Sequence, residues 1–401
     1  MTRLGWSALL GASVTGAALA LGSRPLTVAG LGLLLAVGLA RAWAGAARGP
    51  VALALSVEPR PAVEGDRVRL RVELHRASRV PVGTVTVRGT LGRWGDIECR
   101  LPGHGRVSKG VLDLGRLPRG RFELSEARVV LGDHLGLGAV TVPAEARAAV
   151  LVHPRLVDLG SLFTDMGRLG DDGRRLLFRR PVGFDLHSVR EYEQGESLRR
   201  VHWPTTARRG QLMVKELQDS PRDTVAVLLD CDPAGAAGEA PDASFDVAVR
   251  AAGSLVKALV GRGRRASLVT TGRESHVVTV RALDGDLVAA LDVLASAQPD
   301  SMHGLANVLR RSRSAAMQAG QLFVVTSVLD PLATAELVRA TAQRRVAVVW
   351  IDAPSFRGRP TRVSPGALRL AAAGIPIAIV RSGDELAAAL ELTARKASAH
   401  A

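Results

Sequence analysis

The sequence predicts a multi-domain chain with an N-terminal transmembrane helical hairpin, then a small β-sandwich, and then a doubly wound α/β domain. Three observations carry this prediction: an uncharged apolar start, an alternation of period two up to about residue 152, and strands that alternate with helical patterns from residue 224 onward. At 401 residues the chain has room for two or three domains, and an apolar content of 47% excludes a disordered protein. We expect helices over 1–48, an immunoglobulin-like β-sandwich over 49–153, a linker with a dense polar motif over 154–222, and the α/β domain over 223–401.

The N-terminal helices are expected to form a membrane hairpin. Residues Leu4 to Leu21 and Leu26 to Ala40 carry no charge. Each stretch approaches the length that crosses a bilayer, the second when its end at Trp43 is included. Gly22 to Pro25 forms a tight break between them, so Trp6 and Trp43 would lie at the same membrane face as interfacial anchors.

The charges around this hairpin predict its orientation. Arg3, Arg41 and Arg48 flank the open end, against Arg24 alone in the turn, and positive charge favours the cytoplasmic side. We therefore expect a multi-pass protein of the cell inner (cytoplasmic) membrane, with its soluble domains in the cytoplasm. The alternative is a signal peptide, because Ala18-Leu19-Ala20 resembles a cleavage site. The second stretch would then still span the membrane and return the rest of the chain to the cytoplasm.

The formal charge of +15 comes almost entirely from arginine, as a GC-rich genome would produce. As a functional signal it favours an acidic partner surface: membrane lipids, nucleic acid or an acidic protein. Nucleic acid fits poorly and is not expected, because the chain has no zinc-finger spacing and no run of more than two consecutive arginines. Cys99 and Cys231 fall in different predicted domains, which argues against a disulfide framework and fits a reducing compartment.

The middle of the chain reads as short β-strands. Apolar residues from Val68 to Leu74 alternate with charged ones, and Gly and Pro punctuate such runs up to about Val152. This part of the sequence shows no catalytic or ligand-binding motif. We interpret Asp133, His134 and Cys99 as turn and core residues and not as ligands.

The α/β domain begins with the continuous apolar run Thr224 to Leu229, which has the composition of a buried parallel strand. Helical patterns and strands then alternate to the C-terminus, which predicts a parallel sheet covered on both faces. Ligands of such sheets bind beyond the carboxyl ends of the strands, so Asp230 and the turn from Ser327 to Asp330 are the candidate positions.

Asp230 stands at a candidate cation site. The run Asp230-Cys231-Asp232-Pro233-Ala234 lies where a von Willebrand A domain carries Asp-x-Ser-x-Ser to hold a divalent cation. Asp230 and Asp232 remain, and Asp330 follows a later strand, but both Ser positions are lost. The three carboxylates predict a residual site for Mg²⁺ with water, and the lost hydroxyls favour the alternative, a degenerate empty site. We expect no cofactor.

Enzymatic motifs are absent from the sequence. There is no Gly-x-x-x-x-Gly-Lys-Ser/Thr loop, no Gly-x-Ser-x-Gly elbow and no His-Glu-x-x-His. Cys231 follows a predicted strand, but two neighbouring carboxylates would disfavour its thiolate. The sequence therefore predicts a non-enzymatic protein.

The stretch from Phe184 to Gln218 is the densest in chemistry. It gathers the only Tyr of the chain, Tyr192, with His202, Trp203 and several arginines. Arginine beside Tyr and Trp is typical of recognition surfaces, through stacking and bidentate hydrogen bonds. A structural plug held by Arg–Glu pairs would have the same composition, and the residues alone leave both interpretations open.

The same stretch resembles the signature of the bacterial domain-of-unknown-function 58 family, roughly Ser-x-Arg-x-Tyr-x-x-Gly-Asp-x-x-Arg-x-Ile-His-Trp followed by Ser/Thr-Ala-Arg. Glu196 replaces the usual Asp, a mild change. The turn from Asp133 to Leu137 looks like a variant of the family's Asp-Pro-Phe-Gly-Leu. The matching positions that we expect to bind a partner, together with Glu196, are Ser188, Arg190, Tyr192, Gly195, Arg199, His202, Trp203 and Arg208.

The resemblance implies two membrane helices, a β-domain, the signature and a von Willebrand A-like domain that often lacks a complete metal site. Family members are thought to work with MoxR-type ATPases of the AAA+ class, in protein maturation or envelope processes. We therefore expect a membrane-anchored adaptor or scaffold. The alternative is a divalent-cation-dependent ligand-binding domain that uses Asp230 and Asp232.

Overall fold

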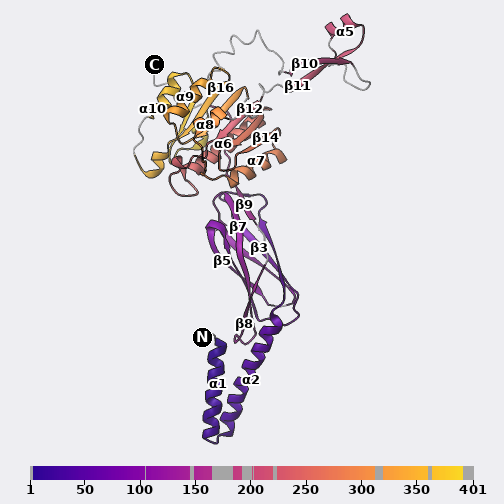
Figure 1. The fold of residues 1–401 in the computed structure, drawn as a ribbon, viewed down its shortest axis with the longest axis vertical. Helices are drawn as coiled ribbons and strands as arrows, with labels where there is room; N and C mark the ends of the chain where they lie inside the picture. Colours follow the sequence, from indigo (N-terminus) through magenta and orange to yellow (C-terminus); the bar gives the residue numbers. More distant parts are fainter. Residues whose placement is uncertain are drawn as a thin grey trace. The chain divides into compact units, whose positions relative to one another are not determined.

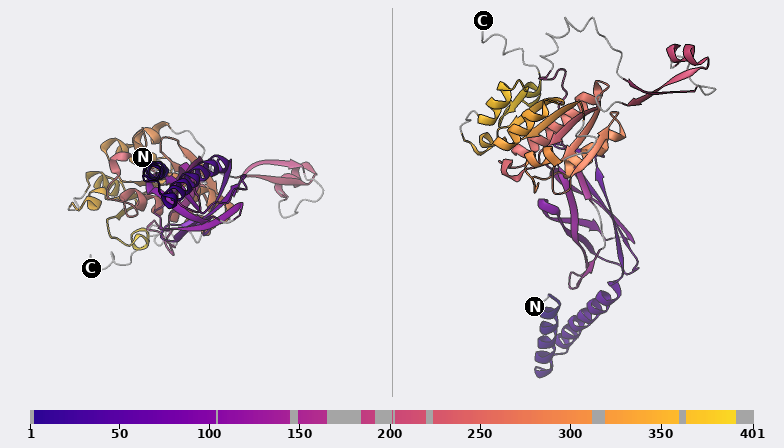
Figure 2. Two further views of the ribbon diagram at one scale, coloured as in Figure 1. Left: turned by 90° about the horizontal axis from the view of Figure 1, so that it is seen from below. Right: turned by 45° about the horizontal axis from the view of Figure 1, so that its top comes forward.

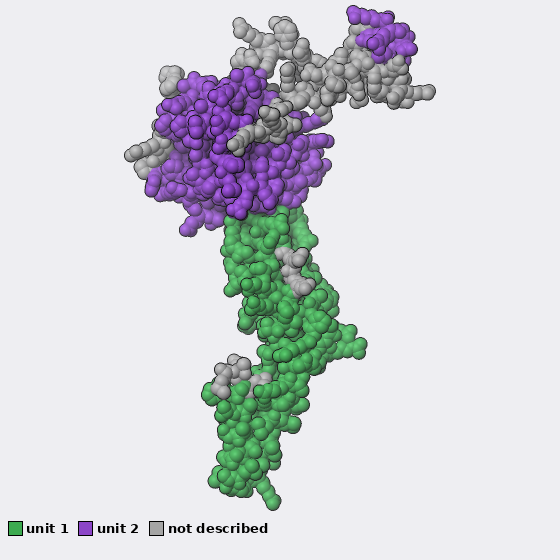
Figure 3. All heavy atoms as spheres, in the orientation of Figure 1, with its two compact units in different colours: residues 1–153 green, residues 154–401 purple. Residues whose placement is uncertain are grey.

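The computed structural model describes residues 3–103, 105–144, 149–164, 184–191, 201, 203–219, 224–311, 319–359 and 364–391. The chain divides into two compact units, Met1–His153 and Pro154–Ala401 (Figure 3). Each unit is described by itself. The first contains a helix pair and two β-sheets, and the second contains a six-stranded sheet covered by helices.

The first unit begins with the expected pair of apolar helices, α1 (Arg3–Ala20) and α2 (Arg24–Ala47). The helices pack closely because small residues face the partner helix: a Cβ on Gly30 would overlap the hydroxyl of Thr15, and one on Gly11 would lie 3.1 Å from Leu34 Cδ2. Among the described residues, α2 is long and apolar enough to cross a membrane, whereas the apolar part of α1, Gly5–Ala20, is shorter.

Two β-sheets follow in the first unit. One has the order β1-β3-β6, and the other has the order β2-β9-β7-β4-β5, with β8 paired to β7. The inward residues of both sheets form one hydrophobic core, which includes Val68 and Leu74 of β3 and Phe122 and Leu131 of β7. The strands are β1 (Val51–Glu58), β2 (Ala62–Val63), β3 (Arg67–Arg76), β4 (Thr84–Leu91), β5 (Gly95–Pro102), β6 (Val107–Arg116), β7 (Gly120–Gly132), β8 (Ala139–Pro143) and β9 (Ala149–His153).

The second unit contains a six-stranded sheet in the order β14-β13-β12-β15-β16-β17. Its strands are parallel except β14, which pairs with β13 antiparallel at the edge. The strands are β12 (Thr224–Leu229), β13 (Arg265–Thr270), β14 (His276–Val280), β15 (Gln321–Thr326), β16 (Arg345–Ile351) and β17 (Ile377–Val380).

Helices cover both faces of this sheet (Figure 1). Alternate residues of β12 enter two separate cores, Val227 and Leu229 on one face and Ala226 and Leu228 on the other. The first core contains residues from α6 (Ser244–Gly261), α7 (Gly285–Ser296) and α11 (Leu386–Leu390). The second contains residues from α8 (Leu305–Arg311), α9 (Pro331–Ala340) and α10 (Pro365–Ala372).

The segment after the first unit departs from the expected linker. Leu159, Leu162 and Phe163 pack on the α6 face of the sheet, Phe163 N donates to Leu390 O at 2.9 Å, and its ring meets Phe323 edge-on at 6.1 Å between centroids. Residues 154–164 therefore belong to the α/β core. The sequence pattern also did not predict α10 or the antiparallel direction of β14.

The packing of the two helices generates a prediction. Gly30→Val should push α1 and α2 apart, because the added side chain has no room beside Thr15, at a cost of about 1–3 kcal/mol. Nitroxide labels at the exposed Leu10→Cys and Leu35→Cys should report a longer or broader distance distribution in the full chain. The matched control is Gly32→Val, where a Cβ meets nothing within 4 Å. Equal distributions for both variants would contradict the packing.

Candidate functional site

The carboxyl end of β12 carries a buried carboxylate, Asp230, which is 5% exposed. Its backbone N–H donates to Val325 O on β15. Its side chain accepts hydrogen bonds from Thr326 Oγ1 at 2.7 Å and from Thr271 Oγ1 at 3.3 Å. The pKa of Asp230 is raised to about 6, mainly by burial; the Thr326 hydrogen bond opposes the shift, and the charge of Asp232 adds to it. The site is therefore built to hold a carboxyl group largely away from water.

The other two predicted metal ligands have local roles. Asp232 accepts from Ala234 N at 2.9 Å and begins the short 3₁₀ turn Pro233–Gly235. Asp330 accepts from Ala333 N at 2.6 Å and is the N-cap of α9. Each carboxylate thus satisfies backbone donors of its own segment.

The donor set does not fit a hard divalent cation, which needs several oxygen ligands around one point. Ala234 offers no side-chain oxygen, and Ser301 donates its hydroxyl to His303 O at 2.8 Å, although its N–H reaches Cys231 O at 3.0 Å. Within the ranges that the structure describes, no group of three or more His, Cys, Asp or Glu is placed to hold a metal ion.

Cys231 is fully buried beside Asp230. Burial raises the pKa of its thiol to about 12, and the charges of Asp230 and Asp300 act in the same direction. Its backbone N–H donates to Thr271 Oγ1 at 2.9 Å. In this environment the thiolate is not available as a nucleophile.

A second buried carboxylate, Asp352, was missed by the sequence analysis. It follows β16 and is 0% exposed, and neither of its oxygens has a hydrogen-bond partner among the described residues. Arg381 Nε approaches one oxygen at 3.8 Å. The signal was available, since Asp352 follows an apolar run in the same way as Asp230 follows β12.

The signature segment folds in part as a strand pair that carries a short helix (Figure 2). β10 (Phe184–Glu191) pairs with β11 (Met213–Asp219), which sets Ser188 opposite Glu216 and Arg190 opposite Val214. Thr206 Oγ1 accepts from Met213 N at 3.0 Å and ties α5 (Trp203–Arg209) to β11.

The helix α5 presents the predicted recognition residues to solvent. Trp203 is 64% exposed, and Arg208 and Arg209 at the last turn are exposed as well. Two residues anchor the segment: Val201 and Met213 are buried. The remaining predicted partner residues, Tyr192, Gly195, Glu196, Arg199 and His202, lie outside the described residues.

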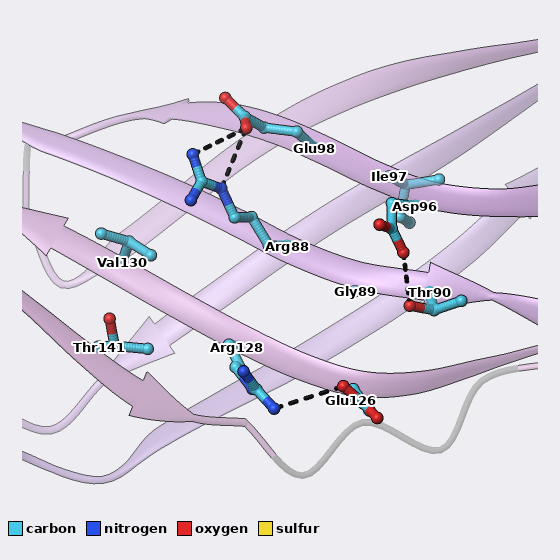
Figure 4. Close-up of a pocket in the computed structure, with 10 residues that line it drawn as sticks. All are labelled: Arg88, Gly89, Thr90, Asp96, Ile97, Glu98, Glu126, Arg128, Val130 and Thr141. Atoms are coloured by element: carbon cyan, nitrogen blue, oxygen red, sulfur yellow. Dashed lines mark hydrogen bonds and ion pairs between the residues drawn. The ribbon is translucent and has the colours of Figure 1, made fainter.

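A depression of about 500 Å³ lies on the outer face of β4, β5, β7 and β8 in the first unit (Figure 4). The charged side chains that line it bind one another: Arg88 pairs with Glu98 at 3.0 Å, Arg128 with Glu126 at 3.3 Å, and Thr90 donates to Asp96 at 2.7 Å. These groups satisfy one another and leave no set of donors aimed at a ligand.

The chain is a multi-domain α/β protein. It has an apolar helix pair, two small β-sheets and a helix-covered sheet that is preceded by a strand pair. Within that class, residues 188–355 match the family described as "Protein of unknown function DUF58". The match begins in β10 and ends just after β16, so it includes α5 and Asp230. The resemblance predicted from the signature is confirmed.

One curated relative is the "Uncharacterized protein YeaD" of Bacillus subtilis (strain 168), 26% identical over 279 residues, which are 67% of this chain and 68% of the relative. Among solved structures, proximal thread matrix protein 1 from the mussel byssus is 15% identical, with a TM-score of 0.29, over 42% of this chain and 46% of its own.

Cwp6 from Clostridium difficile is 10% identical, with a TM-score of 0.16, over 83% of this chain and 37% of its own. The chain thus spans less than half the length of these solved structures.

The raised pKa of Asp230 predicts a pH dependence of stability. The folded state keeps the proton up to about pH 6, whereas the unfolded chain releases it near its ordinary value of 3.8. Stability contributed by this group is therefore present at low pH and is lost as pH rises toward 6. Asp230→Asn should raise the free energy of unfolding at pH 7 by up to about 3 kcal/mol, and by little at pH 4.

Asparagine fits the hydrogen-bond pattern, because its amide can donate to Thr326 Oγ1 while that hydroxyl donates to Val328 O, 3.0 Å away. Thermal unfolding of the full chain, followed by circular dichroism at several pH values, measures the effect. Asp284→Asn, at an exposed position with no side-chain cap bond, is the control. A destabilised Asp230→Asn at pH 7 would show that the carboxylate is needed in its charged form.

Proposed function

We propose that this chain is a membrane-anchored, non-enzymatic adaptor. Its α/β unit would have a von Willebrand A-like fold and face the cytoplasm, and the chain would act with a MoxR-type AAA+ ATPase in protein maturation or envelope processes. The observation that carries the proposal is the exposed Trp203 on α5, the same short helix that carries the exposed Arg208, inside the part of the chain that matches the family.

The strand order supports the proposed fold of the second unit. The first strand in sequence, β12, has two strands on one side and three on the other, which corresponds to the doubly wound order 3-2-1-4-5-6, here with an antiparallel edge strand. Asp230 follows the first strand, where the von Willebrand A pattern begins. For the first unit, two sheets around one core support a β-sandwich.

The helix pair supports membrane anchoring. Large apolar side chains of both helices remain exposed, such as Leu10 at 60% and Leu19 at 69% on α1, and Val28 at 71% and Leu35 at 66% on α2. Such surfaces are costly in water and favourable in lipid. With both chain ends of the hairpin flanked by arginine, the proposed location is the inner membrane with the two soluble units in the cytoplasm.

The exposed Trp and arginines of α5 support the adaptor role. A solvent-facing Trp with arginines at the last turn of the same helix is the composition of an interaction hot spot, where an aromatic anchor enters a partner's pocket and guanidinium groups bind acidic side chains. At the carboxyl edge of the sheet, by contrast, the groups resemble a structural network: Asp230 is buried and hydrogen-bonded, and the Cys231 thiol is protonated.

A divalent-cation-dependent ligand binder remains the second candidate, since Asp230 and Asp232 stand two residues apart at the carboxyl end of β12. Calorimetric titration of the full chain with millimolar Mg²⁺ or Mn²⁺ tests it. We expect no binding heat, because Asp232 and Asp330 cap backbone donors. Heat that disappears in Asp232→Asn would instead establish the cation site and weaken the adaptor proposal.

The adaptor proposal is tested on α5. The tagged full chain is purified from its native membranes in detergent, with and without ATP, and the recovered proteins are identified. We expect an AAA+ ATPase whose recovery depends on nucleotide and falls about tenfold or more in Trp203→Ala combined with Arg208→Ala. Trp94→Ala, at a 43% exposed Trp of the first unit, is the matched control. Undiminished recovery in the α5 variant would place the partner surface elsewhere.

A further inference from the structure

The end of α2 is joined to the β-sheets of the first unit by specific contacts. Trp43 Nε1 donates to Pro81 O at 2.7 Å, Ser78 Oγ donates to Ala46 O at 3.1 Å, and Ala77 N donates to Pro50 O at 3.2 Å. The loop 77–83 therefore packs against the last turns of the helix. We call the end of the β-sheets that contains this loop the helix-side end.

Two further loops gather at the helix-side end. The buried Arg76 holds the loop 103–106 through the carbonyls of Gly103 and Gly105, and it also reaches Val80 O at 3.3 Å. The turn 133–138 lies against the loop 77–83, since a Cβ on Gly83 would stand 2.8 Å from His134 Cα. The helix-side end is thus a surface of three loops beside the last turns of α2.

Unpaired arginines mark this surface. Four arginines here are exposed: Arg41 near the end of α2, Arg48 at its C-cap, Arg79 in the loop 77–83 and Arg106 in the loop 103–106. None of these four forms an ion pair with any described residue. Several arginines farther along the sheets are paired: Arg67 pairs with Asp113 at 3.0 Å, Arg71 with Glu58 at 2.8 Å and Arg121 with Glu123 at 2.8 Å. Arg69 and Arg116 are exposed there without an ion pair to a described residue, but they are not gathered beside the end of α2.

Acidic groups near the helix-side end are already occupied. The Asp133 carboxylate accepts from Leu137 N at 3.0 Å and Gly138 N at 2.8 Å within its own turn. Glu73, farther along β3, binds Lys109 at 3.0 Å and His75 at 3.2 Å, and the Lys109 hydrogen bond lowers its pKa. Among the described residues, therefore, these neighbouring carboxylates are bound elsewhere and do not pair with the four arginines.

An exposed apolar side chain completes the surface. Leu135, at the tip of the turn 133–138, is 72% exposed. The turn is held closed by Asp133, so the leucine is presented on a defined loop. The turn that carries Leu135 contacts the loop 77–83, which Trp43 hydrogen-bonds and which carries the unpaired Arg79. An exposed leucine with arginines and a Trp on neighbouring segments is a composition with which proteins insert into the headgroup region of a bilayer.

We propose that the helix-side end binds the headgroups of anionic phospholipids through Arg41, Arg48, Arg79 and Arg106, with Leu135 inserted among them. The proposal rests on the membrane anchoring proposed above and adds the lipid class and the residues that recognise it. It gives the β-sheets of the first unit a direct contact with the leaflet, where anionic lipid attracts arginine over distances within a Debye length.

The test uses the full chain reconstituted into two kinds of vesicle, phosphatidylcholine alone and phosphatidylcholine with phosphatidylglycerol. An environment-sensitive fluorophore is attached at Leu135→Cys, with Cys99 and Cys231 left in place because both are buried. We expect iodide to quench this label roughly threefold less with phosphatidylglycerol than without it, and the protection to disappear at high salt. The same label at Trp94→Cys, in the turn between β4 and β5 at the other end of those strands, should be quenched equally in both.

Two double substitutions distinguish the effect of the arginines at the helix-side end from the effect of the chain's overall charge. Arg79→Ser with Arg106→Ser should remove most of the protection of the Leu135→Cys label. Arg69→Ser with Arg116→Ser, which removes the same charge at exposed positions away from the helix-side end, should leave it intact. Equal quenching in both vesicle types, or equal effects of the two double variants, would overturn the inference.

Flotation of the same vesicles distinguishes the two proposals. If the chain floats with both vesicle types while the Leu135→Cys label stays accessible in both, anchoring stands and the headgroup surface is wrong. If the chain floats with neither, the membrane anchoring itself fails, and the headgroup surface fails with it.

Discussion

The carboxyl group of Asp230 ties together the ends of three neighbouring strands. It terminates β12, the first strand of the doubly wound order, and it accepts hydrogen bonds from Thr326 at the end of β15 and Thr271 just after β13. Thr271 in turn accepts the backbone N–H of Cys231. Hydrogen-bond partners reduce the free-energy cost of burying a carboxyl group, so the position of this acid depends on these two hydroxyls. The loops that begin at the three strand ends therefore start from fixed positions.

Strand and helix positions of the second unit could be predicted because burial leaves a strong local signal. The run from Thr224 to Leu229 is buried on both faces of a sheet and is therefore apolar throughout. The direction of β14 was also predictable in principle. Only 271–275 separate it from β13, which is too short for a parallel crossover. By contrast, the packing of Leu162 and Phe163 on the sheet depends on tertiary contacts that no local pattern reports.

The candidate site shows a different limit. Spacing identified Asp230, Asp232 and Asp330 as carboxylates near the carboxyl edge, but it did not show which donors they meet. Two of them cap backbone N–H groups, and Pro331 directly after Asp330 is a sequence signal for an N-cap that the search for metal ligands overlooked. Asp352 has the opposite character, since it lacks any hydrogen-bond donor among the described residues. Aspartates that follow apolar strands in the same way in the sequence thus have different physical roles in the structure.

Composition explains the number of arginines but not their pairing. A compositional bias alone would place Arg on every surface of the protein. Whether a given Arg is paired then depends on whether an acidic residue stands near it. On β3 and β7, Arg67, Arg71, Arg121 and Arg128 each form an ion pair with a carboxylate. Near the end of α2, the carboxylate of Asp133 accepts hydrogen bonds within its own loop. Unpaired cations cost little in water, yet they gain most where the facing surface is anionic, and the apolar helix that leaves this end is the element whose exposed leucines favour a bilayer.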